Sequence, residues 1–260
     1  MAEIVNPARA RLAAGELALG VGIRLTRSVE IARMMKRCGF DWLFLDLEHG
    51  MMSLDAAAQM AIAALDAGIA PIARVPERQF AMAARALDGG AWGIVMPHVD
   101  TADEARAIVD HLKFPPAGHR SSGGMLPHLG YRAMNSGEAA RIVNAEMLLV
   151  AMIETPAGVA NADAIAAVPG IDGLLIGSND LSLELGIAGQ FEHEKIVAAY
   201  DTVIAACRRH GKFPGMGGVS EEAVFRRYIA AGMRMILGGN DAPFLLAAAA
   251  QRTGMLRRCL

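Results

Sequence analysis

Two kinds of segment alternate along the chain: short apolar runs rich in Val, Ile and Leu, and longer Ala-rich runs with charges at helical spacing. This alternation is typical of βα units around a parallel sheet whose strands are buried on both faces. The apolar runs predict eight strands, at 18–24, 42–49, 70–76, 93–99, 147–154, 173–178, 212–218 and 233–239. A helical stretch follows each run, at 28–38, 53–67, 78–88, 101–112, 157–167, 192–210, 220–231 and 242–252.

Eight such units favour a closed (β/α)8 TIM barrel, with a doubly wound open sheet as the competing arrangement. A length of 260 residues suits one barrel, so we expect a single domain over 1–260. One connection interrupts the alternation: residues 113–136 are rich in Gly, Pro, Ser and His. Loops of this length are often functional, and the glycines after Arg120 favour contact with an anion or substrate over a plain surface excursion.

The amino-acid composition limits which classes of protein the chain can belong to. Apolar residues make up 53% of the chain, enough for a large core, and the formal charge of -2 attracts neither nucleic acid nor an anionic membrane surface. Three widely spaced cysteines suggest neither a disulfide framework nor a zinc site. With a polar N-terminal segment and no membrane span, the sequence predicts a cytoplasmic protein.

In barrels of this kind the active site lies at the carboxyl ends of the strands. The second predicted strand ends in Asp46-Leu47-Glu48-His49. An Asp paired with a His fixes the imidazole tautomer and raises its basicity, which suits a general base near neutral pH. A structural hydrogen bond of His49 is an equally good interpretation.

The third predicted strand ends with Arg74 inside an otherwise apolar run. A buried guanidinium needs an anionic partner because an unpaired buried charge is costly. That partner is either a structural carboxylate such as Glu48 or, as we favour, a carboxylate or enolate oxygen at the mouth of the barrel.

Two carboxylates follow the fifth and sixth predicted strands. Glu154 closes one apolar run, and Asp180 comes directly after Gly177-Ser178-Asn179. Hard oxygen ligands of this kind hold a divalent cation, and a 2-oxo acid would supply further oxygens. The alternatives are an ion pair between Glu154 and Arg74, and helix capping by Asp180.

Five segments match one known family, and together they span most of the chain: FDWLFLDLEHG (40–50), PIARVP (71–76), GGAWGIVMPHVDTADEA (89–105), KFPPAGHR (113–120) and MIETPAGVANADAIAAVPGIDGLLIGSNDLSLELG (152–186). In these segments the chain resembles the HpcH/HpaI aldolases, the class II pyruvate aldolases. Two positions depart from the common pattern. Met152 stands where many members have Gln, and Ser178-Asn179 replaces a Pro-Ala or Pro-Ser pair.

The resemblance implies a carbon–carbon lyase in which Glu154 and Asp180 bind Mg²⁺ or Mn²⁺, with Co²⁺ as a further candidate. Arg74 would contact the pyruvate oxygens, and His49, oriented by Asp46, would be the acid/base group, acting through a water. We also expect substrate contacts from Met152, Gly177, Ser178 and Asn179.

Such enzymes cleave 4-hydroxy-2-oxo acids to pyruvate and an aldehyde, or run the condensation in reverse. The resemblance further implies a hexamer, a dimer of trimers, with C-terminal helices exchanged between subunits. Three alternative functions stay open. They are an oxaloacetate decarboxylase or related lyase or synthase of this fold, a non-catalytic barrel that binds a metal and a 2-oxo acid, and a phosphate-binding barrel isomerase using the glycines at 215–218 and 238–240.

Overall fold

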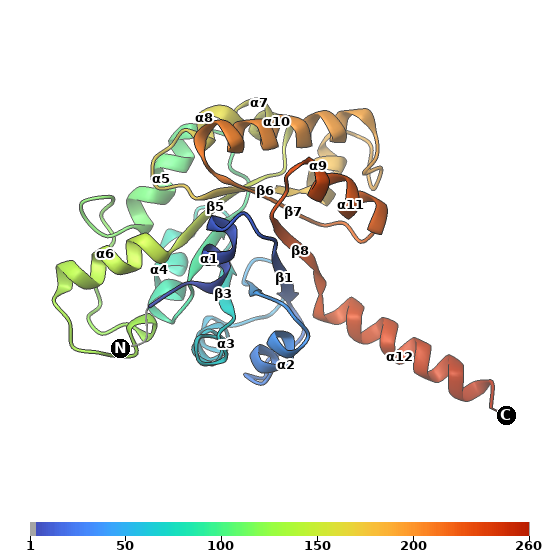
Figure 1. Ribbon diagram of the computed structural model, residues 1–260, viewed down its shortest axis with the longest axis horizontal. Coiled ribbons are helices and arrows are strands. Elements are labelled where there is room, and N and C mark those ends of the chain that lie inside the picture. The colour runs from blue at the N-terminus through green and yellow to red at the C-terminus, as the bar shows by residue number, and fades with distance from the viewer. Residues whose placement is uncertain (1–3, 260) are drawn as a thin grey trace.

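The computed structural model describes residues 4–259 and contains a closed barrel of eight parallel strands (Figure 1). The strands pair in sequence order, β1 with β2 and onward, and β8 closes the barrel against β1. The predicted barrel is therefore confirmed over the open sheet. The strands are β1 (Ala18–Ile23), β2 (Trp42–Asp46), β3 (Ala70–Arg74), β4 (Gly93–Met96), β5 (Leu148–Ile153), β6 (Gly173–Gly177), β7 (Phe213–Gly217) and β8 (Met235–Asn240).

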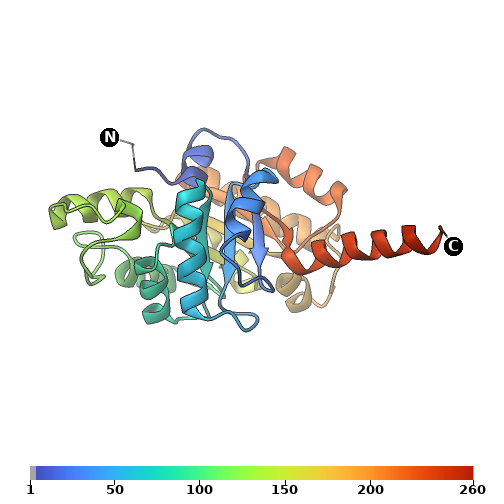
Figure 2. The same ribbon diagram turned by 90° about the horizontal axis from the view of Figure 1, so that it is seen from below.

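The barrel is surrounded by helices that follow the strands in alternation (Figures 1 and 2). The helices are α1 (Pro7–Ala13), α2 (Ile31–Arg37), α3 (Leu54–Ala67), α4 (Phe80–Asp88), α5 (Ala102–Leu112), α6 (Ser136–Glu146), α7 (Pro156–Ala160), α8 (Ala162–Ala166), α9 (Ser178–Glu184), α10 (Glu194–His210), α11 (Glu222–Ala231) and α12 (Asp241–Arg257), with a 3-10 turn η1 (Pro127–Leu129).

Sequence signals at helix ends explain several boundaries. The Ser53 side chain accepts the backbone N–H of Ala56 at the start of α3, and Gly68 ends that helix with a left-handed φ of 68°. At α5, Thr101 and Glu104 form a reciprocal capping box. These local hydrogen bonds satisfy backbone groups that a helix end would otherwise leave without partners.

Two apolar clusters form the core. The larger one fills the space between the strands and the surrounding helices. The smaller lies inside the barrel, where Trp42 is fully buried and its Nε1 donates to the Ala18 carbonyl at 3.1 Å. A glycine at position 20 makes this packing possible, since a Cβ there would lie 2.1 Å from the indole Cε2.

The structure differs from the expected helices in four places. The helix predicted at 157–167 consists of α7 and α8, which meet at Asn161 with φ of -96° and ψ of 5°, outside helical geometry. Helices α1, α6 and α9 were not predicted. Helices α1 and α9 have only seven residues each, about two turns, and α6 is buried mainly through Val143, so none of the three has a long apolar stripe.

The long segment at 113–136 packs partly against the barrel. Arg120 is buried, donates from Nη2 to Asp88 at 2.6 Å and lies over the ring of Phe114. His128 donates from Nε2 to the Ala91 carbonyl at 2.8 Å, and burial lowers the pKa of His128 to about 4. The expected anion contact of Arg120 is therefore an ion pair within the chain, and the exposed Ser121–Gly124 stretch borders a separate hollow of about 290 Å³ beside α6.

Helix α12 extends away from the barrel (Figures 1 and 2). Of its 17 residues only Asp241 is buried, while Phe244, Leu245 and Leu246 are exposed. Over the described range 4–259, the structure has no helix with the length and apolar character needed to span a bilayer.

Candidate active site at the barrel mouth

A pocket of about 210 Å³ opens at the carboxyl ends of the strands, where a barrel of this type presents its loops. Its wall combines charged, amide and glycine positions from several strands. The lining residues are Arg24, Phe44, His49, Arg74, Met152, Glu154, Leu175, Gly177, Ser178, Asn179, Asp180, Gly217, Gly218, Leu237 and Asn240. All predicted site residues except Asp46 line this pocket, and Asp46 lies directly behind it, bound to Arg74.

Asp46 is the centre of a buried ion network at the ends of β1, β2 and β3. Its Oδ2 accepts from Arg74 Nη2 and from Arg24 Nε, each at 2.6 Å, and its Oδ1 accepts from Arg74 Nε at 3.1 Å. Burial alone would raise the pKa of Asp46, but the two guanidinium groups and backbone N–H donors hold it below its ordinary value. Asp46 therefore stays ionised and fixes both arginines at the pocket.

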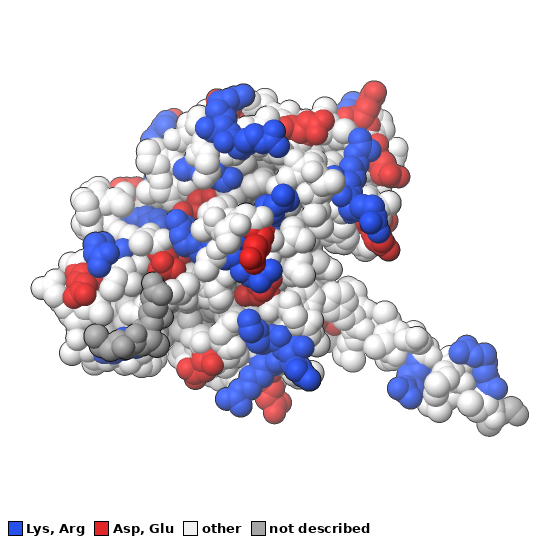
Figure 3. Space-filling model, in the orientation of Figure 1, with Lys and Arg blue, Asp and Glu red and all other residues white. Residues whose placement is uncertain are grey.

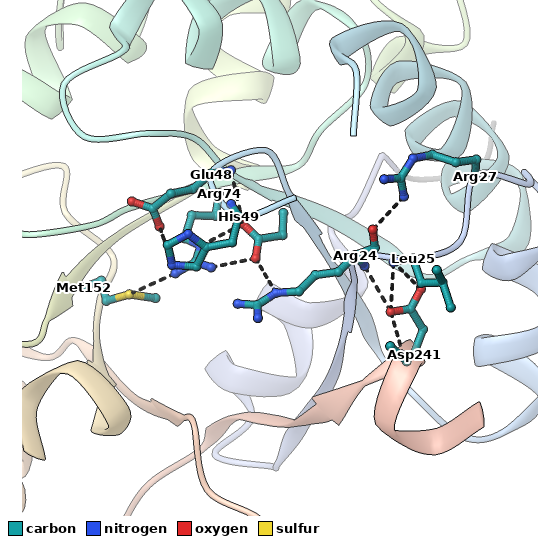
Figure 4. A network of polar contacts seen from close by, with 10 residues as sticks. Arg24, Leu25, Arg27, Glu48, His49, Arg74, Met152 and Asp241 are labelled. Atoms are coloured by element: carbon teal, nitrogen blue, oxygen red, sulfur yellow. Dashed lines mark hydrogen bonds and ion pairs between the residues drawn. The ribbon is translucent and has the colours of Figure 1, made fainter. Parts of the chain in front are cut away.

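Arg74 fits both interpretations made from its sequence. Its Nη1 lies 2.9 Å from Glu48 Oε2, so it does have a structural carboxylate partner. It also lines the pocket, with Nη1 3.9 Å from the sulfur of Met152. Held by two carboxylates, this guanidinium faces the pocket in a fixed orientation (Figure 4).

Asp46 does not form the expected contact with the imidazole of His49. Asp46 Oδ1 accepts the backbone N–H of His49 at 3.1 Å, so it fixes the main chain, and the imidazole Nε2 lies 3.8 Å from Glu48 Oε2. The reason is that Arg24 and Arg74 occupy both oxygens of Asp46. The His49 side chain, 54% exposed, lies at the pocket in contact with solvent.

Glu154 follows β5 and is the most buried acid facing the pocket, with a side chain 1% exposed. Its Oε1 accepts the backbone N–H of His98 at 2.8 Å, and the His98 ring nitrogen Nδ1 lies 3.3 Å away. Burial, together with the negative charges of Asp180 and Glu48, raises the pKa of Glu154 to about 7, although the contacts with His98 act in the opposite direction. Arg74 pairs with Asp46 and Glu48, so the alternative ion pair between Arg74 and Glu154 is not formed.

Asp180 lies in the first turn of α9, which begins directly after β6. The helix starts at Gly177 without a side-chain cap, so the capping alternative for Asp180 is not realised among the described residues. Gly177 packs closely against Glu154: a Cβ at this position would lie 2.5 Å from Glu154 Oε2. The glycine therefore makes room for the Glu154 carboxylate beside the end of β6.

The other predicted substrate contacts, Ser178, Asn179 and Met152, differ in which of their groups can reach a ligand in the pocket. The Ser178 hydroxyl is buried and hydrogen-bonds the Tyr200 hydroxyl at 2.6 Å, so it is already satisfied by the protein. Asn179 is exposed at the rim, and Met152 is buried in the floor. At Gly177–Asn179, the backbone is thus better placed than the serine side chain to contact a ligand.

Two polar pocket residues were not predicted from the sequence, Arg24 directly after β1 and Asn240 at the end of β8. His98 was not predicted either; it lies outside the pocket lining, contacts Glu154 and adopts a left-handed φ of 51° after β4. A polar residue at the end of each apolar run was the available signal, but only four strand ends were interpreted in this way. Between residues 4 and 259, no group of three or more His, Cys, Asp or Glu side chains is assembled as a metal cage, so any cation here relies on two carboxylates plus other ligands.

Comparison with known proteins agrees with this geometry. The family model described as HpcH/HpaI aldolase/citrate lyase matches residues 25–246. A 4-hydroxy-4-methyl-2-oxoglutarate aldolase of Hapsidospora irregularis is 41% identical, covering 94% of this chain and 92% of its own length. A hydroxypyruvate/pyruvate aldolase of Pseudomonas aeruginosa is 32% identical over 97% of this chain and 93% of its own.

A solved HpcH/HpaI aldolase from Desulfitobacterium hafniense superposes with a TM-score of 0.90 at 30% identity, covering 96% of each chain. Both the sequence relatives and the solved structure extend over the entire barrel. The chain therefore belongs to the HpcH/HpaI aldolase/citrate lyase family of carbon–carbon lyases.

Proposed function

We propose that this enzyme is a divalent-metal-dependent aldolase that cleaves or forms 4-hydroxy-2-oxo acids through the enolate of pyruvate. The observation that carries the proposal is that Glu154, Asp180, Arg74 and His49 border one small pocket at the carboxyl ends of the strands. A pocket of about 210 Å³ suits a small acid better than a bulky ligand.

Glu154 and Asp180 would hold Mg²⁺ or Mn²⁺, with Co²⁺ as a further candidate. The donor set fits such an ion, because both ligands are hard carboxylates that border the same pocket. Burial, aided by the charges of Asp180 and Glu48, raises the pKa of Glu154, and a bound cation would favour its ionised form. Gly177 supports the same assignment, since its missing side chain leaves room for the Glu154 carboxylate. When bound, the cation supplies the positive charge that stabilises an enolate oxygen.

Arg74 would bind the oxygens of the 2-oxo acid. Its partners Asp46 and Glu48 hold the guanidinium at 2.6 and 2.9 Å, so little reorganisation is needed when substrate binds. The backbone N–H groups of Ser178 and Asn179, at the start of α9, would contact the substrate carboxylate. Met152 would close the apolar floor of the site.

His49 would serve as the acid/base group, directly or through a water. In cleavage it accepts the proton of the C4 hydroxyl while the C3–C4 bond breaks, and the electrons of that bond form the enolate. Returning a proton to C3 then yields the methyl group of pyruvate. Asp46 assists by fixing the backbone of His49, which leaves the exposed ring free to reach substrate.

We further propose that the chain works as one barrel domain in a homo-oligomer, a hexamer built as a dimer of trimers, whose C-terminal helices are exchanged. The support is α12: its exposed Phe244, Leu245 and Leu246 lie within an uncharged stretch, 242–251, and Figure 3 shows the arm as white before the basic residues near its end. Free Cys38, Cys207 and Cys259 fit the reducing cytoplasm. Light scattering of the full chain beside a Leu245→Glu, Leu246→Glu variant tests the assembly, and an unchanged mass in the variant would contradict it.

The activity is tested on metal-stripped enzyme. We expect no pyruvate release from a panel of 4-hydroxy-2-oxo acids with EDTA present, and recovery on adding Mg²⁺, Mn²⁺ or Co²⁺. Asp180→Asn should lose the recovery, while Asp201→Asn, which removes an exposed acid of α10, should keep it. Full activity in EDTA would overturn the metal assignment. Oxaloacetate decarboxylation exceeding aldol cleavage under one metal would favour the decarboxylase alternative.

A further inference from the structure

Ser178 and Tyr200 form a buried pair of hydroxyl groups behind the pocket, and the proposed reaction assigns no task to this pair. Both side chains are fully buried, and the two hydroxyl oxygens lie 2.6 Å apart. Ser178 is the first residue of α9, which lines the pocket with Asn179 and Asp180, whereas Tyr200 belongs to α10. The pair therefore joins the turn that carries a proposed metal ligand to a helix of the outer layer.

The turn between β6 and α9 has few restraints of its own. In the part of the chain that the structure describes, α9 begins at Gly177 without a side-chain cap. Ser178 also stands where the common family pattern has Pro, and a proline at the first position of a helix fixes φ covalently. A serine at this position leaves φ free to vary, so a contact with another element has to supply the restraint.

The ring of Tyr200 is fixed by its surroundings, so that its hydroxyl points to one place. Helices α9 and α11 both pack against α10 (Figure 1). Tyr200 stacks on Tyr228 of α11, with ring centroids 3.6 Å apart and planes inclined by 15°. Burial raises the pKa of Tyr200, so the hydroxyl keeps its proton at neutral pH. Because a buried hydroxyl without a partner is costly, the start of α9 is favoured where Ser178 meets Tyr200.

The other end of α9 is held in a similar way. The Ser182 hydroxyl donates to the Asn179 carbonyl at 2.8 Å and accepts the Gly189 N–H at 3.0 Å. Asp180 lies between Ser178 and Ser182, so the two serines fix the short stretch of chain from which its carboxylate projects.

We propose that Tyr200 is a positioning residue that acts through Ser178: the hydrogen bond between them holds the first turn of α9 so that Asp180 shares a cation with Glu154. This inference rests on the proposed aldolase function and gives the outer helix α10 a part in metal binding. A shift of Ser178 would move Asp180, two residues later, whereas Glu154 follows a different strand and would stay in place. A ligand that is already oriented before the ion arrives binds it more tightly.

Mn²⁺ affinity tests the proposal without turnover, by electron paramagnetic resonance of the free ion. Tyr200→Phe keeps the ring and removes the hydroxyl, and it should bind Mn²⁺ roughly tenfold more weakly than the wild type, the lower end of the usual effect of an outer-shell partner. Tyr228→Phe is the matched control. It removes the other hydroxyl of the same stack, which donates to the Phe191 carbonyl at 3.4 Å, and should keep the wild-type affinity. Circular dichroism and thermal melting establish that each variant is folded.

Two changes at Ser178 separate positioning from a general loss of stability. Ser178→Ala removes the other half of the bond, so combining it with Tyr200→Phe should weaken Mn²⁺ binding no further than either change alone. Ser178→Pro restrains the turn without a hydroxyl, so adding it to Tyr200→Phe should restore most of the lost affinity. A bond that contributes only to stability would instead lower the melting temperature of Tyr200→Phe and leave its Mn²⁺ affinity unchanged.

Four results would overturn the assignment of Tyr200. They are wild-type Mn²⁺ affinity in Tyr200→Phe, an equal loss in Tyr228→Phe, additive losses from Ser178→Ala and Tyr200→Phe, and no recovery when Ser178→Pro is added. Failure of the underlying function has a different signature: wild-type enzyme with Mn²⁺ would then not exchange the methyl protons of pyruvate for deuterium. A wild type that exchanges these protons, beside a Tyr200→Phe variant with unchanged affinity, keeps its aldolase function and loses only the role of Tyr200.

Discussion

Replacing Glu154 with Gln should stabilise the metal-free protein at alkaline pH, although the same change should abolish metal-dependent activity. Gln keeps the shape of the side chain and an oxygen acceptor for the His98 N–H, which now lies 2.8 Å from Oε1. It removes a charge that burial and two neighbouring acids make costly.

The expected size follows from the raised pKa. One pKa unit corresponds to about 1.4 kcal/mol, so the rise from 4.5 to about 7 corresponds to roughly 3 kcal/mol. The unfolded chain releases this proton near pH 4.5 and the folded protein near pH 7, so wild-type stability falls as pH rises between these values. The variant should therefore gain under about 1 kcal/mol at pH 5 and roughly 3 kcal/mol at pH 8.

The measurement is urea unfolding at pH 5 and pH 8 in EDTA, followed by circular dichroism. Glu138→Gln, at an exposed position in α6, controls for the change in net charge. Asp180→Asn should recover part of the gain, because it removes one of the charges that raise the pKa of Glu154. Mg²⁺ should stabilise the wild type alone. A variant no more stable than the wild type at pH 8, or a gain independent of pH, would refute the reasoning.

Three further changes test separate features. Asp46→Asn should cost roughly 3 kcal/mol in urea unfolding, because it leaves two guanidinium groups without their shared anion; an unchanged midpoint would argue against the network. Gly20→Ala should lower stability by about 1–3 kcal/mol, since its Cβ would lie 2.1 Å from Trp42, and an unaltered melting temperature would contradict this. Gly177→Ala should push Glu154 aside and weaken Mn²⁺ binding by roughly ten- to a hundredfold in calorimetry. Wild-type affinity in this variant would show that the glycine is not needed.

The sequence determined the barrel and much of the pocket. All eight strands lie where the apolar runs predicted them. Strands buried on both faces consist of continuous hydrophobic segments, which can be recognised in the sequence alone. The ends of those runs also located Arg74, Glu154 and Asp180, since an ionisable residue closing an apolar strand of a barrel tends to face the mouth.

Only the tertiary structure decided how these groups are paired. Asp46 and His49 are three residues apart, and this spacing suggested that their side chains pair. In the structure Asp46 binds two arginines that are 22 and 28 positions away. The contact of Glu154 with His98, 56 positions earlier, was equally hidden. Local spacing limits which groups can meet, but buried charges select the partners that best offset their desolvation, and those partners come from whichever strands the closed barrel brings together.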